Sequence, residues 1–132
     1  MICVVIHGII NRIVKKMKNK IVNFIKKEYG TIPEYLWKKY PTFCVFRHVD
    51  NNKWFALVAT LPRKILGVPG DGVVDFINVK CDKETVDFFH GVNGILPAYH
   101  MNKQNWVTVL LDGTVPEKNV KKLISMSFDL TK

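Results

Sequence analysis

The chain has 132 residues and a formal net charge of +9. Hydrophobic side chains make up 48% of the sequence and charged side chains 23%, which excludes wholesale disorder and predicts one globular domain. Residues 1–40 carry nine basic and two acidic side chains, a net of +7, whereas residues 41–132 carry eleven and nine, a net of +2. An acidic partner such as nucleic acid, anionic lipid or an acidic protein is therefore attracted mainly to the N-terminal third.

Residues 6–29 predict one amphipathic helix, because their apolar side chains recur at steps of three and four residues. Basic side chains fill the remaining positions, and Gly30 is placed to end the helix. The pattern is typical of a helix that covers a sheet with a solvated lysine face, but a polyanion-binding face and a membrane-surface helix are open alternatives. We interpret residues 1–19 as a basic helical extension and residues 20–132 as a single domain.

Two local motifs follow this helix. Residues 31–34, Thr-Ile-Pro-Glu, predict the start of a short helix with the proline in its first turn. Residues 43–48 and 53–59 then predict two strands joined by a turn at residues 50–52. The motifs predict a short aromatic helix leading into a β-hairpin.

The turn end of this hairpin is rich in cationic and aromatic side chains. Alternation along the first strand places Arg47 and His48 on opposite faces, and Lys53 and Trp54 open the second strand. One interpretation is a solvated hairpin tip with the indole packed on the sheet. The other is a wing, in which cations meet phosphates and the indole packs on a sugar or base.

The rest of the chain alternates further strands and helices. Residues 73–80 predict a strand, and Asp82 is a credible N-cap for a short helix around residues 83–90. Residues 107–111 predict another strand, and residues 117–128 a final amphipathic helix. Because the order has no βαβ rhythm, we predict an α+β class, a two-layer domain with an antiparallel sheet and helices on one face.

Catalytic and metal-binding motifs are missing from the sequence. The four histidines lack metal-ligand spacing, and no Gly-x-Ser-x-Gly or phosphate-loop motif occurs. The three cysteines, Cys3, Cys44 and Cys81, are widely spaced and predict buried thiols in a reducing cytoplasm. No stretch is long and apolar enough for a membrane span. We predict a non-enzymatic cytoplasmic protein without cofactor or metal, and favour a monomer.

The segment from Tyr99 to Trp106 is denser in polar and aromatic side chains than a core requires. His100, Asn102, Lys103 and Trp106 offer donors, a cation and flat rings, which are the groups that contact nucleic acids. The structural alternative is that His100 and Asn102 bond the turn backbone while the indole closes the sheet edge. The residues by themselves leave both interpretations open.

Several of these stretches together resemble the MmcQ/YjbR family of small bacterial proteins. The matching segments, in order, are Phe46-Arg47-His48, residues 52–57, residues 78–82, residues 94–103 with Trp106, and Leu111-Asp112-Gly113. The resemblance covers roughly residues 20–132, and residues 1–19 lie outside it. One departure is Asn105, where many members carry histidine, so a role that needs a second imidazole is weakened.

The resemblance implies a compact domain likened to double-wing DNA-binding domains and to CyaY-like folds, and it implies a DNA-binding role. The family's distinctive positions in this sequence are Arg47, His48, Lys53, Trp54, His100, Asn102, Lys103 and Trp106. We predict non-specific, salt-sensitive DNA binding through these residues, strengthened by the basic N-terminal helix. The alternative is a protein- or small-ligand-binding module of the same fold.

Overall fold

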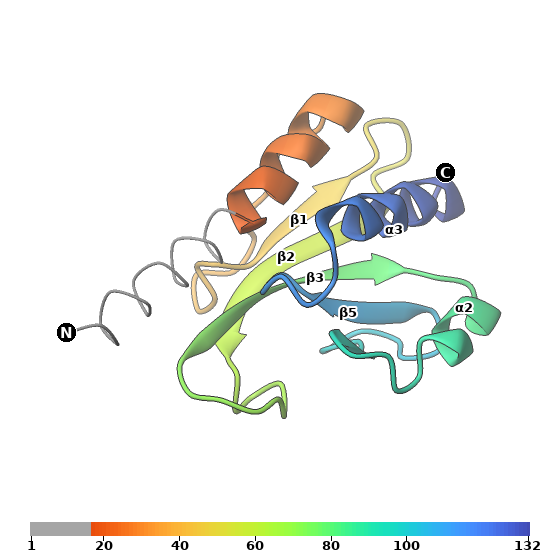
Figure 1. Cartoon of the computed structure of the whole chain (residues 1–132). Helices are drawn as coiled ribbons and strands as arrows, with labels where there is room; N and C mark the ends of the chain where they lie inside the picture. The colour runs from red at the N-terminus through yellow and green to blue at the C-terminus, as the bar shows by residue number, and fades with distance from the viewer. Residues whose placement is uncertain (1–16) are drawn as a thin grey trace.

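The computed structural model describes residues 17–132. Five strands form one antiparallel sheet in the order β1-β2-β3-β5-β4. The strands are β1 Cys44–Arg47, β2 Trp54–Pro62, β3 Val73–Lys80, β4 Ile95–Pro97 and β5 Trp106–Leu110. The helices are an N-terminal helix, described over residues 17–29, α2 Lys83–Phe88 and α3 Glu117–Leu130 (Figure 1). The predicted α+β class is confirmed. Residues 6–16 of the predicted first helix lie outside the described residues.

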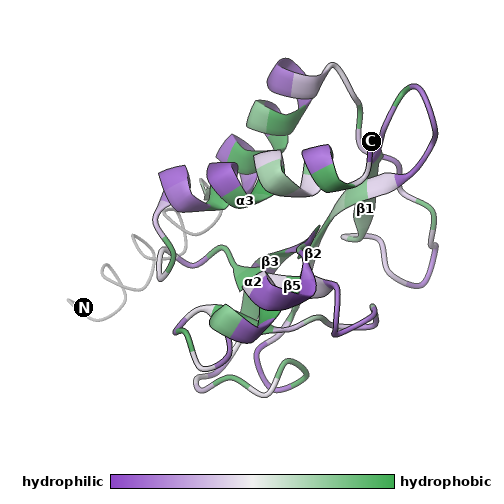
Figure 2. Ribbon diagram, turned by 90° about the vertical axis from the view of Figure 1, so that its right-hand side faces the viewer, coloured by the Kyte–Doolittle hydropathy of each residue, from purple (hydrophilic) through white to green (hydrophobic). Residues whose placement is uncertain are grey.

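The N-terminal helix and α3 lie side by side on one face of the sheet (Figure 1). Lys20 is 3.9 Å from Glu117 near the starts of the two helices, and Tyr29 stacks on Phe128 at 4.3 Å near their ends. The two helices therefore run in the same direction. Hydrophilic and hydrophobic residues alternate along α3 (Figure 2), as expected of a helix with one buried side. None of the helices within residues 17–132 is long and apolar enough to cross a membrane.

The main core lies between this helix pair and the sheet. Its largest fully buried side chains are Ile21, Ile25, Phe46, Phe55, Ile77, Leu111 and Ile124. These positions are the apolar stripes of the two helices and one alternating face of the strands, so the periodicity of the sequence is what builds this layer.

One lysine of the predicted solvated face has a structural contact instead. The Nζ atom of Lys18 donates to Thr60 Oγ1 at 2.9 Å and lies 4.0 Å from Asp75 Oδ1. Asp75 is buried and also accepts a hydrogen bond from the Thr60 hydroxyl. Lys18 therefore links the N-terminal helix to β2 and β3. Lys26 and Lys27 are exposed, as the prediction expects.

The predicted short helix after Gly30 is wrong. Glu34 instead forms an isolated antiparallel bridge with Val45, and the backbone hydrogen bonds in both directions are 3.0 Å long. The hydroxyl of Thr31 donates to the carbonyl of Arg47 at 3.1 Å. Because β1 is an edge strand, its outer N–H and C=O groups need partners, and the extended segment supplies them.

Most of the other predicted elements are confirmed. The hairpin, β3 and β5 lie where they were predicted, and Asp82 caps α2 by accepting the backbone N–H of Thr85 at 2.8 Å. Helix α2 ends at Phe88, two residues earlier than predicted, and α3 extends two residues further to Leu130. Strand β4 was not among the predicted strands; it pairs with β5 and forms one edge of the sheet.

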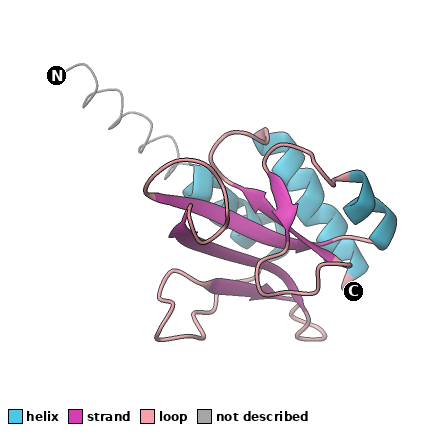
Figure 3. Cartoon of the chain, turned by 90° about the horizontal axis from the view of Figure 1, so that it is seen from below, coloured by secondary structure: helices cyan, strands magenta, loops and turns pink. Residues whose placement is uncertain are grey.

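The second face of the sheet, opposite the N-terminal helix and α3, is called the open face here. Figure 3 looks toward it, and loops cross it in place of the helices that cover the other side. A smaller apolar cluster lies on this face, formed by Phe43, Val45, Leu57, Ala59, Val74, Phe76 and Leu110. Aromatic side chains from the loops pack against this cluster, so the open face carries a second, thinner core.

Candidate functional site

Two of the predicted contact residues, Trp54 and His100, line the same pocket on the open face, with a volume of about 250 Å³. Trp54 begins β2, whereas His100 lies in the loop between β4 and β5. The other lining residues are Trp37, Tyr40, Phe43, Leu57, Tyr99 and Met101. This set is called the aromatic pocket. The fold therefore joins the predicted hairpin group and the predicted polar–aromatic segment at one surface.

Edge-to-face contacts order the rings of the aromatic pocket. Trp37 meets Trp54 with a centroid separation of 5.8 Å and an interplanar angle of 88°, and meets Phe43 at 6.2 Å and 81°. Tyr99 meets Phe43 at 6.5 Å and 68°. Such arrangements place the positive edge of one ring on the negative face of another and favour fixed orientations. The pocket walls are therefore packed against one another in defined positions.

A buried polar network positions Tyr99 over the sheet. The Thr108 hydroxyl accepts the backbone N–H of Tyr99 at 2.9 Å, and the Asn78 Nδ2 group donates to its carbonyl at 3.0 Å. The same hydroxyl donates to Asn78 Oδ1. Both Asn78 and Thr108 are fully buried in neighbouring strands. Both backbone groups of Tyr99 are thus bound by side chains from β3 and β5.

His100 continues this surface with an uncommon backbone conformation. Its φ is +54°, in the left-handed region that non-glycine residues rarely adopt, although histidine is enriched there. Its ring stacks on Tyr99 with a centroid separation of 4.1 Å and an interplanar angle of 20°, and the residue is exposed. One face of the imidazole therefore rests on the tyrosine, and the residue as a whole is accessible to solvent.

Asn102 has a turn-forming role. Its Oδ1 atom accepts the backbone N–H of Gln104 at 2.8 Å, and its carbonyl accepts the N–H of Asn105 at 3.3 Å. The side-chain bond is the local pattern by which asparagine stabilises turns. Asn102 is exposed, so its amide group is still open to solvent while its oxygen shapes the loop.

The predicted cations of the hairpin differ in their surroundings. The Nε atom of Arg47 donates to Glu34 Oε2 at 2.8 Å, and the guanidinium lies 5.8 Å from the centroid of the Trp54 ring. The charge of Arg47 is therefore balanced by a carboxylate at the edge of the aromatic pocket. Lys53 is exposed and immediately precedes Trp54 in the chain.

His48 is a core residue, which corrects its predicted place at an exposed contact surface. It is 6% exposed, lies on the helix-covered face and packs 4.1 Å from the Phe128 ring. Its Nε2 atom is 2.7 Å from Thr131 Oγ1. Because that hydroxyl donates to the Ser127 carbonyl, the imidazole is the donor. Asn51 also donates to the Thr131 carbonyl at 3.0 Å, so the hairpin tip is fastened to the end of α3 and is not a free wing.

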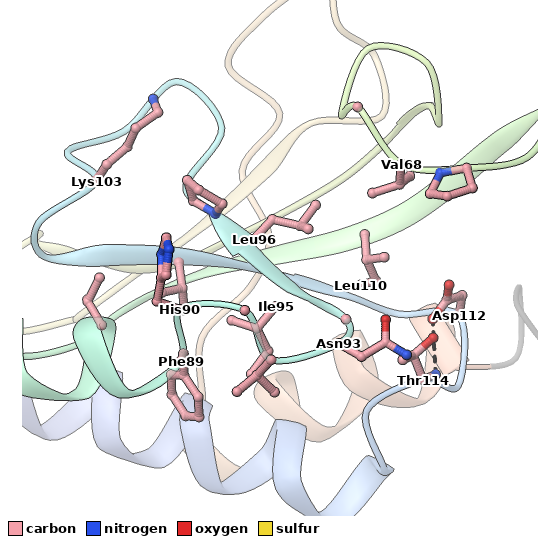
Figure 4. Close-up of a pocket in the computed structure, with 18 of the residues that line it drawn as sticks. Val68, Phe89, His90, Asn93, Ile95, Leu96, Lys103, Leu110, Asp112 and Thr114 are labelled. Atoms are coloured by element: carbon pink, nitrogen blue, oxygen red, sulfur yellow. Dashed lines mark hydrogen bonds between the residues drawn. The ribbon is translucent and has the colours of Figure 1, made fainter.

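Lys103 stands at one end of a second cavity, which lies beside β4 and has a volume of about 790 Å³ (Figure 4). Leu96 and Leu110 point into this cavity, whereas the Lys103 amino group points away from them (Figure 4). His90 also lines the β4 cavity. Trp106 is half-buried at the start of β5 and lines neither this cavity nor the aromatic pocket.

An ion pair closes the other end of the β4 cavity. Arg63 Nη2 lies 3.5 Å from Asp112 Oδ2, and the backbone N–H of Thr114 donates to Asp112 Oδ1 at 3.0 Å. Burial raises the pKa of Asp112, but the hydrogen bonds from Thr114 and the Arg63 charge outweigh it, so the pKa lies below its ordinary value. The carboxylate is therefore a fixed structural anion.

The two cysteines within residues 17–132 are buried free thiols. Burial raises the pKa of Cys44, and burial followed by the nearby Asp82 charge raises the pKa of Cys81 to about 11. Both shifts keep the thiols protonated and disfavour nucleophilic chemistry. In the described part of the chain, no three His, Cys, Asp or Glu side chains gather closely enough to hold a metal ion.

The fold and site define a small α+β sheet domain with an aromatic pocket on its helix-free face. The YjbR family model matches residues 27–130, and the chain belongs to the YjbR family. It is 40% identical to protein YyaQ of Bacillus subtilis over 115 residues, which is 87% of this chain and 98% of that protein.

Solved structures show the same fold. A crystal structure of a Pseudomonas syringae protein matches with a TM-score of 0.83 at 43% identity, covering 86% of this chain and 97% of that one. A solution NMR structure of a protein from the same organism has a TM-score of 0.78 at 43% identity, and the match covers 87% of this chain and 92% of that one. A crystal structure of a Deinococcus radiodurans protein at 24% identity has a TM-score of 0.61. The match covers 83% of this chain and 76% of that one, and the similarity is in fold alone.

The contact residues predicted from sequence omit six of the eight residues that line the aromatic pocket. Trp37, Tyr40 and Phe43 are among the omitted residues, because no contact role was predicted for this region of the sequence. The available signal was their aromatic density, with Trp37, Tyr40 and Phe43 within seven residues. That signal does not show that Tyr99 lies beside them, because the contact depends on the order of strands in the sheet.

Proposed function

We propose that this protein binds nucleic acid, DNA in the first instance, through the open face of its sheet, and that it acts as a binding protein and not as an enzyme. The observation that carries the proposal is the meeting of Trp54 and His100 in one aromatic pocket, whose chain segments also carry exposed lysines. The proposal keeps the DNA-binding role implied by the family resemblance. It involves fewer contact residues than the eight predicted from the sequence.

The segments that form the aromatic pocket carry an excess of positive charge. Residues 31–54 hold four basic and two acidic side chains, and residues 97–106 hold one basic and none acidic. Lys38 and Lys39 are exposed and lie in the chain between two pocket residues. Lys53 and Lys103 are exposed within two positions of Trp54 and Met101. Phosphates are attracted to such cations, so the chain segments that form the pocket favour an anionic backbone as partner.

The pocket itself offers mainly stacking surfaces, with His100 as its one imidazole and Tyr40 and Tyr99 as its phenols. Of the described residues that line it, none carries a carboxylate, a thiol or a serine hydroxyl. Flat rings beside cations are the combination by which proteins hold bases and backbone phosphates together. This composition supports binding without turnover.

The revised contact set is smaller than the predicted one. Lys53, Trp54, His100 and Lys103 keep their predicted roles as backbone or base contacts. Arg47 supports the Trp54 ring from its pair with Glu34. Asn102 shapes the loop, and Trp106 lies outside the aromatic pocket.

The test is a fluorescence-anisotropy titration of labelled duplex and single-stranded DNA with the full chain at about 50 and 200 mM salt. We expect the Lys38→Glu/Lys39→Glu and Lys53→Glu/Lys103→Glu pairs each to weaken binding about tenfold or more at low salt, and to flatten the salt dependence.

The matched control is Lys118→Glu/Lys122→Glu, which makes the same charge change at exposed positions of α3, an element of the opposite face. We expect a loss below about threefold, from the change in net charge alone. If all three double variants lost the same affinity for DNA, the interaction would be explained by the net positive charge of the protein and not by the open face. Reversal of Lys26 and Lys27 tests the predicted contribution of the N-terminal helix in the same assay.

A second candidate function is small-ligand binding at the β4 cavity. Its volume of about 790 Å³ falls within the range of roughly 300–1,000 Å³ typical of ligand pockets. Thermal-shift measurements with a panel of small metabolites test it, using Leu96→Trp to fill the cavity. Stabilisation of the parent chain that this variant abolishes would favour the ligand-binding role over the DNA-binding role.

A further inference from the structure

We infer that the aromatic pocket receives one unpaired base, so that the protein prefers single-stranded or locally unpaired nucleic acid to duplex. This inference rests on the proposed nucleic-acid binding and names the form of the ligand that the site selects. Three properties of the pocket carry it: its size, the exposed ring faces at its mouth, and the rigidity of the loop that bears them.

The size of the pocket limits the occupant to one planar group. Its volume of about 250 Å³ lies just below the range of roughly 300–1,000 Å³ that drug-sized ligands occupy. The floor is Leu57 on β2 and the walls are rings, so the interior favours a flat, weakly polar group. A nucleobase is such a group. It is attached to a phosphate backbone, which the exposed lysines of the pocket's chain segments attract.

The mouth of the pocket presents a stacking surface. His100 is exposed and covers Tyr99 at 4.1 Å with nearly parallel planes, so the two rings form a short stack that is accessible to solvent. Tyr40 is 44% exposed and its ring lies 5.0 Å from Phe43. An incoming base can extend the Tyr99–His100 stack in the way that bases stack on aromatic platforms of single-strand-binding proteins.

The loop that carries this stack is fixed before any ligand binds. Tyr99 is held through both of its backbone polar groups by Asn78 and Thr108, and Asn102 closes the following turn. A conformation with φ of +54° at His100 is retained because these bonds determine the path of the chain on both sides. Preorganised rings avoid the entropy cost of ordering side chains during binding.

A paired base cannot use this site without leaving the helix. In a duplex both faces of each base are already stacked on neighbours, whereas an unpaired base exposes its faces and can enter a recess. The exposed lysines of these segments attract both forms of DNA, so the preference arises from the pocket and not from the lysines. Single-stranded DNA is therefore expected to bind more tightly than duplex of the same length.

The three tryptophans of the chain provide an internal probe. Trp37 and Trp54 line the aromatic pocket and Trp106 does not. A base stacked in the pocket is expected to quench the fluorescence of the first two. The full chain is titrated with a single-stranded oligothymidylate of about 12 nucleotides, with an abasic oligonucleotide of equal length and with a duplex. Trp37→Phe/Trp54→Phe is compared with Trp106→Phe as the matched control.

The expected result has three parts. Oligothymidylate binds about 5- to 150-fold more tightly than the abasic strand, and more tightly than the duplex. Quenching persists in Trp106→Phe and disappears in Trp37→Phe/Trp54→Phe. His100→Gly weakens oligothymidylate binding at least about fivefold and narrows the difference in affinity between the thymidylate and abasic strands. Glycine is the residue best suited to a φ of +54°, so this variant removes the ring without straining the fold.

Other outcomes overturn the inference and show where it fails. Equal affinity for the abasic and thymidylate strands would be consistent with nucleic-acid binding but would show that the pocket does not bind a base. Tighter binding of the duplex, or quenching that disappears only in Trp106→Phe, would do the same. A change in tryptophan fluorescence on adding a phenylalanine-rich peptide, and none on adding DNA, would assign the pocket to protein side chains. Absence of binding to every oligonucleotide at low salt would refute the proposed function itself.

Discussion

Asn78 is the residue on which the geometry of the candidate site depends most directly. Its side chain donates to the carbonyl of Tyr99 at 3.0 Å and accepts from the hydroxyl of Thr108, and it is fully buried. Asn78→Leu nearly conserves shape, so it removes both hydrogen bonds while creating little empty volume. The carbonyl of Tyr99 and the hydroxyl hydrogen of Thr108 then lose their partners.

The magnitude follows from these two groups. Leaving a buried polar group without a partner costs about 1–3 kcal/mol, so we expect Asn78→Leu to lower the free energy of unfolding by about 2–4 kcal/mol. An unfolding entropy of about 2.1 cal/mol/K per residue gives about 0.28 kcal/mol/K over 132 residues, so the melting temperature should fall by about 7–14 °C.

Urea denaturation followed by circular dichroism measures this loss, with an unchanged m-value as the sign that stability alone has changed. Asn119→Leu, at an exposed position of α3, is the matched control and should stay within about 0.5 kcal/mol of the parent. The double variant Asn78→Leu/Thr108→Val should cost less than the sum of its single changes, because it removes both partners together. An Asn78→Leu loss below about 0.5 kcal/mol, or strictly additive effects, would refute the reasoning.

Three further predictions concern the scaffold. Ser127→Ala should lower the free energy of unfolding by about 2–4 kcal/mol, since the buried hydroxyl bonds backbone groups of β2 and β3 at 2.6 and 2.8 Å, whereas Ser125→Ala should change it by less than about 0.5 kcal/mol in the same urea assay. Asp112→Asn should cost up to about 1 kcal/mol at neutral pH. Because the folded pKa of Asp112 is lowered, its stabilisation is present above the unfolded pKa and is lost as pH falls through the folded pKa, so the parent and variant denaturation curves should converge in acid; a constant difference would contradict this. In a Cys3→Ser background, Cys81 should resist iodoacetamide at pH 8 until urea unfolds the chain, as followed by mass spectrometry, and rapid native labelling would contradict its burial.

The sequence by itself determined the elements whose causes are local. Alternating apolar residues and the 50–52 turn predicted the hairpin, and Asp82 predicted the start of α2, because turn and capping bonds join residues only a few positions apart. The apolar stripe of α3 predicted Val120, Leu123, Ile124 and Phe128 as its buried side; the first three are buried and Phe128 is half-buried. The α+β class followed from the order of these elements.

Only the tertiary structure decided those elements that form by hydrogen bonding to the edge of another strand. Residues 31–34 carry local helix signals, yet Glu34 is extended because the edge of β1 offers hydrogen-bond partners. Strand β4 has only three residues and includes a proline, and it forms because β5 has a free edge beside it. Neither outcome is encoded in the periodicity of the segment concerned, since the partner lies elsewhere in the chain.

The same distinction applies to the candidate site. Residue chemistry marked Trp54 and His100 separately as candidate contacts, because rings and cations at loop ends suit nucleic acids. Their meeting in one aromatic pocket with Trp37 depends on the strand order and on the buried bonds that bring the 98–105 loop over the open face. His48, which has similar chemistry, was directed into the core by strand alternation and by its bond to Thr131. Residue types are a local property of the sequence, whereas the face on which they meet is set by long-range pairing of the whole sheet.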